Sequence, residues 1–210
     1  MNQKFYSLPE EKQRAILNAG FHVFSQNTYK NSPMREIAET AGISKSLLFH
    51  YFHNKKELYL YLWTFCAEIT IEEMKKSGCY QQTDLFESME SGKNAKLRLM
   101  RMYPDMGTFA VKAFCEEDPE VCREIRGSMD RYIQIHASAK LENLNPDDFI
   151  PGIDLKMMYK DMYLASEGYL WEKMKLGNLN IDEMERDFSE LLSFWKKIYL
   201  KKGKAEYHDD

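Results

Sequence analysis

Residues 32–58 constrain the fold more than any other stretch, because they encode two short helices and the turn between them. Apolar residues recur at helical spacing before Gly42, and glycine readily adopts the positive φ that ends a helix in a tight turn. Ser44 is a favoured N-cap residue and predicts that a second helix follows it. Ser32 and Pro33 are expected to open the first helix, as cap and first helical residue. The pattern therefore predicts a helix, a glycine turn and a second helix.

A small residue followed four positions later by a glycine determines how closely these helices can cross. Ala38 stands where the two helices pack most tightly, and Gly42 then lets the chain turn sharply. Ile43 and Leu48 are expected to fill the wedge between the helices. This spacing is typical of the helix-turn-helix, a DNA-binding motif whose second helix enters the major groove. The competing interpretation is an ordinary helical hairpin with a purely structural role.

The outer side chains of this segment are of types that contact nucleic acid. Amines, hydroxyls and imidazoles donate to base edges and phosphates, and an apolar side chain can contact a thymine methyl group. We expect the bases to be contacted by Lys45, Ser46, Leu47 and His50, and the phosphates by Ser32, Arg35, Tyr51 and Lys55.

Residues 43–58, ISKSLLFHYFHNKKEL, resemble the pattern of the tetracycline-repressor (TetR) family, Ser-Lys-Gly-x-Leu-Tyr-x-Tyr-Phe-x-x-Lys-x-x-Leu. Phe49 departs from that pattern, because the family usually has tyrosine there; it stays in the DNA-binding set without the phenolic contact to phosphate. Thr28 stands where a glycine usually ends the preceding helix, and Asn27 is expected to take the left-handed turn instead. The resemblance covers about the first quarter of the chain. The matching residues are Leu48, Tyr51, Phe52, Lys55 and Leu58, with Ile37, Ala38, Ala41 and Gly42 upstream.

The resemblance implies an all-α fold. A three-helix DNA-binding domain with the helix-turn-helix, residues 1–56, would precede a larger helical domain for ligand binding and dimerisation, residues 57–210. It also implies a ligand-responsive transcriptional regulator, most readily a repressor, that binds a palindromic double-stranded DNA operator as a homodimer. A small-molecule effector, expected to be apolar, would release the DNA. The alternative function is a helical protein-interaction module.

Charge is divided unevenly along the chain. The whole chain carries a net charge of −4, yet residues 1–60 hold eight Lys and Arg against five Asp and Glu, whereas the remainder holds 21 against 28. A basic head on an acidic body is typical of a DNA-binding region joined to a separate partner domain.

No segment resembles a membrane span or a secretion signal. The longest apolar run falls far below the roughly 20 residues that cross a bilayer, and the N-terminus lacks the apolar core of a signal peptide. We therefore expect no membrane association and a cytoplasmic location. The four cysteines form no CxxC pair and are expected to be reduced.

The sequence carries no HExxH, GxSxG, GxGxxG or P-loop pattern, so an enzyme is not expected. His50 and His53 are three residues apart, but no third metal ligand is evident. We expect neither a metal nor another cofactor.

Residues 60–175 are rich in methionine and aromatic side chains, which can wall an adaptable apolar pocket. Such stripes are also typical of an ordinary core, which stays the alternative for any single residue. The candidate ligand-binding residues are Met100, Tyr103, Phe109, Phe114, Met129, Tyr132, Met162 and Tyr163.

Two long helices are predicted at the C-terminal end, opened by Asp154 and Asn180. In the resembled family the corresponding pair forms a four-helix bundle with its copy on a second subunit. The alternative is that their apolar stripes face only the intramolecular core. The candidate dimerisation residues are Met158, Tyr169, Met184, Phe188, Leu191 and Trp195.

Three further expectations concern local structure. Residues 1–8 are expected to be a frayed arm. The polar stretch 88–95 is expected to break a helix, with a new start near Lys93. Tyr29 is expected to pack under the bundle without a functional role.

Overall fold

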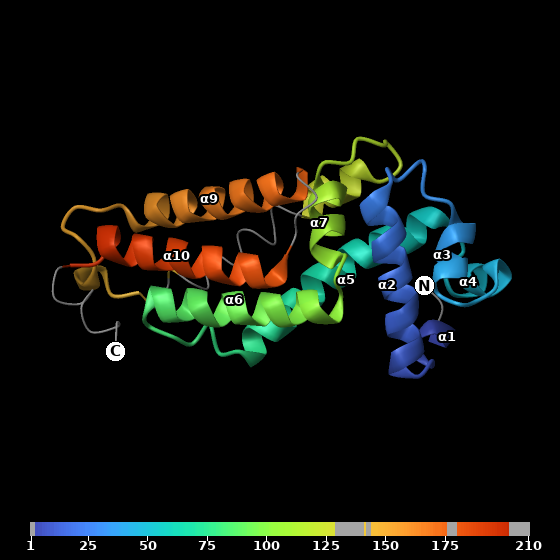
Figure 1. Ribbon diagram of the computed structural model, residues 1–210, viewed down its shortest axis with the longest axis horizontal. Helices are drawn as coiled ribbons and strands as arrows, with labels where there is room; N and C mark the ends of the chain where they lie inside the picture. The colour runs from blue at the N-terminus through green and yellow to red at the C-terminus, as the bar shows by residue number, and fades with distance from the viewer. Residues whose placement is uncertain (1–2, 129–140, 142–143, 176–179, 202–210) are drawn as a thin grey trace. The chain divides into compact units, whose positions relative to one another are not determined.

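The computed structural model describes residues 3–128, 141, 144–175 and 180–201 (Figure 1). In these residues the fold is built of helices, which confirms the predicted all-α class. None of the described helices is long and apolar enough to cross a membrane. The helices are α1 (Gln3–Tyr6), α2 (Glu10–Gln26), α3 (Met34–Thr40), α4 (Lys45–Tyr51), α5 (Lys55–Lys76), α6 (Leu85–Met102), α7 (Met106–Phe114), a helix described over 122–128, the short 3-10 helix η1 (Pro146–Asp148), α9 (Leu155–Lys175) and α10 (Ile181–Tyr199).

The chain divides into two compact units, each of which is described by itself. The first unit comprises Met1–Ile69 and Leu99–Tyr132, and the second comprises Thr70–Arg98 and Ile133–Asp210. The first unit therefore holds α1 to α4, the start of α5, the end of α6, and α7. It is larger than residues 1–56 because part of the later chain packs with it, and the predicted functional division of the chain stays a prediction.

Aromatic rings from α2, α5 and α7 form the core of the first unit. The ring centroid of Tyr59 lies 4.7 Å from that of Phe24 and 5.1 Å from that of Phe109, in edge-to-face contacts. Such contacts add to the stabilisation that burial of the rings provides. Helices α2 and α5 cross closely at Gly20, where a Cβ atom would lie 2.7 Å from Cδ1 of Leu62.

The first residues are not a frayed arm, so that prediction was wrong. Gln3–Tyr6 form α1, and Phe5 is fully buried with its ring centroid 5.0 Å from Phe52 and 5.6 Å from Tyr61. Burying a phenylalanine side chain contributes roughly 1.5–3 kcal/mol, which outweighs the tendency of a chain end to fray. The start of the chain is therefore part of the core of the first unit.

Helices α9 and α10 of the second unit lie side by side and run antiparallel (Figure 1). The Tyr199 hydroxyl donates to Oδ2 of Asp161 at 2.9 Å, and Nζ of Lys173 donates to Oε1 of Glu183 at 2.6 Å. These two hydrogen bonds join opposite ends of the helix pair. Apolar residues buried between this pair and α6 include Leu85, Phe86, Met158, Met162, Leu192 and Trp195.

Helix α6 runs without a break through residues 88–95, contrary to the prediction. Its polar side chains have partners outside their own helix. Oγ of Ser91 accepts a hydrogen bond from Nε2 of Gln82 at 3.1 Å, and Nζ of Lys93 donates to Oγ of Ser189 on α10 at 2.8 Å. These contacts offset the weak helix propensity of the serines and the glycine.

Capping residues open several helices, at Asp154 and Asn180 where the sequence predicted them. Oδ1 of Asp84, Asp154 and Asn180 each accepts hydrogen bonds from the backbone N–H groups two and three positions later, at 2.8–3.1 Å. These bonds satisfy N–H groups that have no partner within the first helical turn.

Candidate DNA-recognition surface

The turn between α3 and α4 has the predicted geometry. Gly42 has φ of +67°, the left-handed conformation, and its N–H donates to the Glu39 carbonyl at 3.1 Å. The N–H of Ile43 reaches back to the carbonyl of Ala38 at 3.0 Å. Oγ of Ser44 accepts a hydrogen bond from the N–H of Leu47 at 3.1 Å, which confirms the predicted cap of α4. The two helices are therefore held at a fixed angle by short backbone contacts.

Helix α4 has one buried face and one solvent-exposed face, as a helix that enters the DNA major groove must have. Leu48 is fully buried under the helix, whereas the four predicted base-contacting residues are all exposed. Phe49 is half-buried, and Nζ of Lys45 lies 5.7 Å from its ring centroid. The exposed set, brought together on one helix of seven residues, is Lys45, Ser46, Leu47 and His50.

The start of α3 differs from the prediction. Ser32 is fully buried, and its hydroxyl donates to the Thr28 carbonyl at 2.9 Å instead of capping α3. Pro33 occupies the cap position and accepts no side-chain bond. Asn27 has φ of −122°, so it does not take the left-handed turn; its amide instead donates to the Val23 carbonyl at 3.1 Å. Ser32 is therefore a structural residue of the loop rather than an exposed phosphate ligand.

Tyr51 is also buried rather than exposed to phosphate. Its side chain is 7 % exposed and its ring centroid lies 6.2 Å from that of Phe5. The reason is helical periodicity, because Tyr51 follows the buried Leu48 by three residues and so lies on the same face. The phenol packs on α1, an element that the sequence did not predict.

Arg35 is the most exposed of the predicted phosphate ligands. Its side chain is 77 % exposed, and Nε donates to Oε1 of Glu39 one turn later at 2.7 Å. The hydrogen bond to Glu39 raises the pKa of the guanidinium further above its ordinary value. The remaining N–H groups of Arg35 still face solvent.

Lys55 begins α5 and is held by its surroundings. Nζ donates to the Lys30 carbonyl at 2.9 Å and lies 4.6 Å from the ring centroid of Tyr29. The helix start is fixed by a variant of the capping box, in which Oδ1 of Asn54 accepts from the Glu57 N–H at 2.8 Å and the Glu57 carboxylate accepts from the N–H of His53, one residue before the cap.

The Glu57 carboxylate also contacts His53, one of the two histidines considered as metal ligands. Oε2 of Glu57 accepts from the His53 N–H at 2.9 Å and lies 2.7 Å from Nδ1 of His53. Among the residues that the structure describes, no group of three His, Cys, Asp or Glu side chains is placed to hold a metal ion.

Tyr29 makes two hydrogen bonds to carboxylates that the sequence did not indicate. Its N–H donates to Oε2 of Glu116 at 2.8 Å, and its hydroxyl donates to Oε2 of Glu120 at 2.7 Å. Burial, and then the hydrogen bond to Glu120, raises the pKa of the Tyr29 phenol. These partners are 87 and 91 residues away in the sequence, so no local pattern could have revealed them.

The predicted ligand-binding residues that the structure describes are divided between the two units. Tyr103 and Phe109 are buried in the aromatic core of the first unit, where each packs against Phe21. Met100 is half-buried and Phe114 is 45 % exposed. In the second unit Met162 is fully buried and Tyr163 is half-buried, while Met129 and Tyr132 lie outside the described residues.

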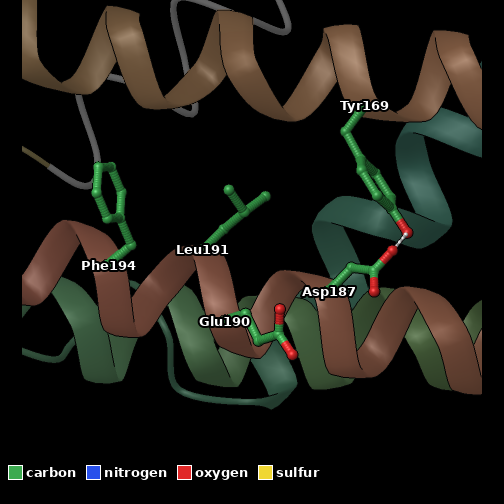
Figure 2. A pocket seen from close by; sticks show the side chains of 5 residues that line it. All are labelled: Tyr169, Asp187, Glu190, Leu191 and Phe194. Atoms are coloured by element: carbon green, nitrogen blue, oxygen red, sulfur yellow. Dashed lines mark hydrogen bonds between the residues drawn. The ribbon is translucent and has the colours of Figure 1, made fainter.

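A surface hollow of about 450 Å³ lies between α9 and α10 of the second unit (Figure 2). Figure 2 shows Tyr169 extending from α9 towards α10, where its hydroxyl donates to Oδ2 of Asp187 at 2.6 Å. Glu190, Leu191 and Phe194 complete the lining. None of these residues belongs to the predicted ligand set, but Tyr169 and Leu191 belong to the predicted dimerisation set.

The dimerisation residues divide into two groups. Met158, Met184 and Trp195 are buried within the chain, which favours the alternative of an intramolecular core for these three. Tyr169, Phe188 and Leu191 are half-buried. Neighbouring residues of a helix are about 100° apart around its axis, so a prediction that is one position off names residues on a different face of the helix. The large apolar side chains that α9 and α10 expose are Met157, Leu164, Phe194 and Ile198.

The model of the family "Bacterial regulatory proteins, tetR family" matches residues 16–62, which run from α2 into α5. The HTH-type transcriptional regulator RutR of Escherichia coli (strain K12) is 27% identical over 151 residues, which are 66% of this chain and 68% of RutR. The HTH-type transcriptional activator FasR of Mycolicibacterium smegmatis is 40% identical over 60 residues, 28% of this chain and 27% of FasR. Members of this family are transcriptional regulators and not enzymes.

The fold is also found in solved structures. The SmeT–triclosan complex superposes with a TM-score of 0.67 at 16% identity, covering 92% of this chain and 94% of SmeT. SmeT is the repressor of the Stenotrophomonas maltophilia multidrug efflux pump SmeDEF. Together with the helix-turn-helix geometry around Gly42, the family match over residues 16–62 and the similarity to RutR identify the chain as a DNA-binding transcription regulator of the tetR family.

Proposed function

We propose that this protein is a ligand-responsive repressor that binds a palindromic operator as a homodimer and leaves the DNA when a small apolar effector binds. The observation that carries the proposal is the exposed face of α4, held by the turn at Gly42 and by the Ser44 cap. A regulator of this kind acts on the chromosome, so we place it in the cytoplasm of a bacterium.

The proposed division of DNA contacts follows from the exposed side chains of α3 and α4 and from Lys55 at the start of α5. Lys45, Ser46 and His50 supply donors to the base edges, and the 37 % exposed Leu47 supplies an apolar contact for a thymine methyl group. Lys55 and Arg35 supply positive charge to the backbone phosphates. Phosphate contacts of this kind give affinity, whereas base contacts give sequence preference.

Dimerisation is supported by the outer face of the second unit. Met157 and Leu164 are seven residues apart on α9, and Phe194 and Ile198 are four apart on α10, so each pair lies on one helix face. The two helices lie side by side (Figure 1), and exposed apolar residues grouped on one helix pair are typical of a protein–protein interface. A two-fold dimer formed through it would present two copies of α4 to two half-sites.

The effector and the direction of regulation are supported by the relatives. SmeT is a repressor that has been solved with triclosan, a small molecule, whereas FasR is named an activator. FasR resembles this chain over 60 residues only, whereas SmeT shares the fold over 92% of it, so we favour repression and a small apolar effector.

Salt-dependent binding to duplex DNA tests the proposal against a purely structural hairpin. The probe is the DNA flanking the protein's own coding region, and fluorescence anisotropy is measured across a range of salt concentrations. The logarithm of the binding constant should fall against the logarithm of salt with a slope of about −0.9 for each phosphate contact. Binding that is absent or unaffected by salt would contradict the proposal.

Two substitutions test the division of roles. Lys55→Ala should weaken binding to all duplexes alike and make the salt slope shallower by about 0.9. His50→Ala should instead change the sequence preference. Lys75→Ala removes an exposed lysine at the end of α5 and serves as the charge-matched control, with binding expected to be unchanged. A uniform loss of affinity in both test variants would contradict the assigned roles.

A further inference from the structure

Tyr29 lies directly beneath the side chain proposed to contact phosphate. Its ring is 3 % exposed, and Nζ of Lys55 lies 4.6 Å from the ring centroid while donating to the Lys30 carbonyl at 2.9 Å. On its other side the ring packs edge-to-face on Tyr59, with centroids 5.0 Å apart at 71°. The lysine is therefore held by an aromatic face and a carbonyl oxygen, both within the loop that precedes α3.

Carboxylates from the segment after α7 fix Tyr29 at both ends. Glu116 accepts from the backbone N–H and Glu120 from the hydroxyl, at 2.8 and 2.7 Å. The other oxygen of Glu116 accepts from the N–H groups of Glu117 and Asp118, both at 3.1 Å, so that this carboxylate is itself held by its own turn. The position of Tyr29 is thus set by a segment that does not belong to the helix-turn-helix.

A second connection joins the same two segments. Nζ of Lys112, on α7, donates to the Ser25 carbonyl at the end of α2 at 2.6 Å. Three hydrogen bonds therefore connect the segment Ser25–Tyr29 to residues 112–120, one at Ser25 and two at Tyr29.

The arrangement affects how the lysine can bind phosphate. A lysine side chain has a flexible stem of four carbons. Its conformational entropy is lost when the side chain becomes ordered on binding, and this loss reduces affinity. The face of an aromatic ring attracts an ammonium group. The phenol of Tyr29 also donates a hydrogen bond to a carboxylate, and this bond increases the electron density of the ring. A lysine that is already held near its binding position loses less freedom when it meets the duplex.

We propose that Tyr29 is a positioning residue for phosphate binding by Lys55, and that Glu116 and Glu120 set where Tyr29 lies. The inference rests on the proposed operator binding and deepens it, because it makes the segment 116–120 a determinant of DNA affinity that does not touch DNA. Removing a nearby negative charge ordinarily strengthens DNA binding. Loss of the Glu120 carboxylate should instead weaken it.

The test is a double-mutant cycle on duplex binding, measured with the full chain across salt concentrations. Tyr29→Leu should weaken binding about three- to tenfold and make the salt slope shallower by about 0.9, as Lys55→Ala does. Tyr29→Phe keeps the ring and loses only the hydroxyl bond, so its effect should be smaller. In the Lys55→Ala background both substitutions should have no further effect, because Tyr29 acts through the lysine.

Glu120→Ala provides a variant at an exposed position, which keeps the test valid if a change at buried Tyr29 disturbs folding. It should weaken binding to about the extent that Tyr29→Phe does. The matched control is Glu124→Ala, one turn later, which removes the same charge and the 2.7 Å ion pair with Lys56 but no contact to Tyr29. Binding by the control should be equal or stronger.

Independent losses in the double variants, an unchanged salt slope for Tyr29→Leu, or stronger binding by Glu120→Ala would each overturn the inference. A wild-type chain that binds DNA normally while Lys55→Ala has no effect would also overturn it, and would leave operator binding intact. Failure of the wild-type chain to bind any duplex would instead remove the proposed function itself, and the two failures are thus distinguishable.

Discussion

The two units of the molecule differ in where they leave large apolar side chains exposed. In the first unit the exposed ones, Tyr6, Leu47, Met102 and Phe114, come from four different helices. In the second unit Met157, Leu164, Phe194 and Ile198 come from α9 and α10, which lie side by side, and Ile150 lies between η1 and α9. Scattered apolar residues need no partner, whereas a continuous apolar face does. The exposed apolar side chains of the first unit are therefore scattered over four helices, whereas most of those in the second unit come from one helix pair, which is where we propose the dimer interface.

The largest expected effect tests whether the core of the first unit is closed. Phe109→Ala removes a fully buried ring of α7 and should lower the free energy of unfolding by about 3–5 kcal/mol. Phe114→Ala, on the same helix but 45 % exposed, is the control and should cost less than about 1 kcal/mol. Urea denaturation of both variants gives the values, and similar losses in the two would contradict the assignment.

The next prediction addresses the apolar face of the second unit. Phe194→Asp places a charge on an exposed part of α10 and should weaken dimerisation by about 2 kcal/mol or more, roughly 30-fold, because aromatic side chains dominate protein interfaces. Phe114→Asp makes the same change on an exposed phenylalanine of the first unit and should leave dimerisation unchanged. Sedimentation equilibrium distinguishes them. Equal effects, or none, would show that α9 and α10 do not form the dimer interface.

A pair of glycines gives effects of opposite sign. Gly42→Ala should destabilise the chain by about 1–2 kcal/mol and weaken DNA binding, because an L-residue is strained at a φ of +67°. Gly168→Ala should stabilise it by up to about 1 kcal/mol, because Gly168 lies within helix α9 and a Cβ there meets nothing within 4 Å. Thermal unfolding with a DNA titration measures both. A loss of stability in both variants would refute the backbone argument.

The smallest effect is a pH dependence of the second unit. The hydrogen bond from the Tyr169 hydroxyl, followed by Lys173, holds the pKa of Asp187 below its usual value. A lowered pKa stabilises the folded state at pH values above the unfolded pKa of about 3.9, and this stabilisation is lost as the pH falls through the folded pKa. Asp187→Asn should therefore show a shallower decline of Tm between pH 6 and 3, to be measured against Glu190→Gln as control. Identical declines for wild type and Asp187→Asn would contradict this.

Features that depend on neighbouring residues could be predicted from the sequence. The left-handed Gly42 and the caps at Ser44, Asp154 and Asn180 involve partners within four positions, and all are present in the structure. Helix α4 and its exposed face followed from the same local signals.

Features that depend on distant residues could not. Helix α6 stays intact because Ser91 and Lys93 bond to other parts of the chain, and Tyr29 is held by carboxylates about 90 residues later. The burial of Tyr51 depends on α1, whose ring at Phe5 gave no periodic pattern. On α9 and α10 the periodicity was correct, but it does not indicate which face has an intramolecular partner.

The crossing at Gly20 limits how the protein can evolve. With Cδ1 of Leu62 only 2.7 Å from where a methyl group would begin, a heavier residue at this position must first shift the Leu62 side chain, and the penalty should grow with side-chain volume. At Gly42 nothing lies within 4 Å, so there the cost comes from chirality and is nearly independent of size. A larger residue at position 20 is therefore best tolerated together with a smaller residue at position 62, whereas no second substitution would relieve the strain at position 42.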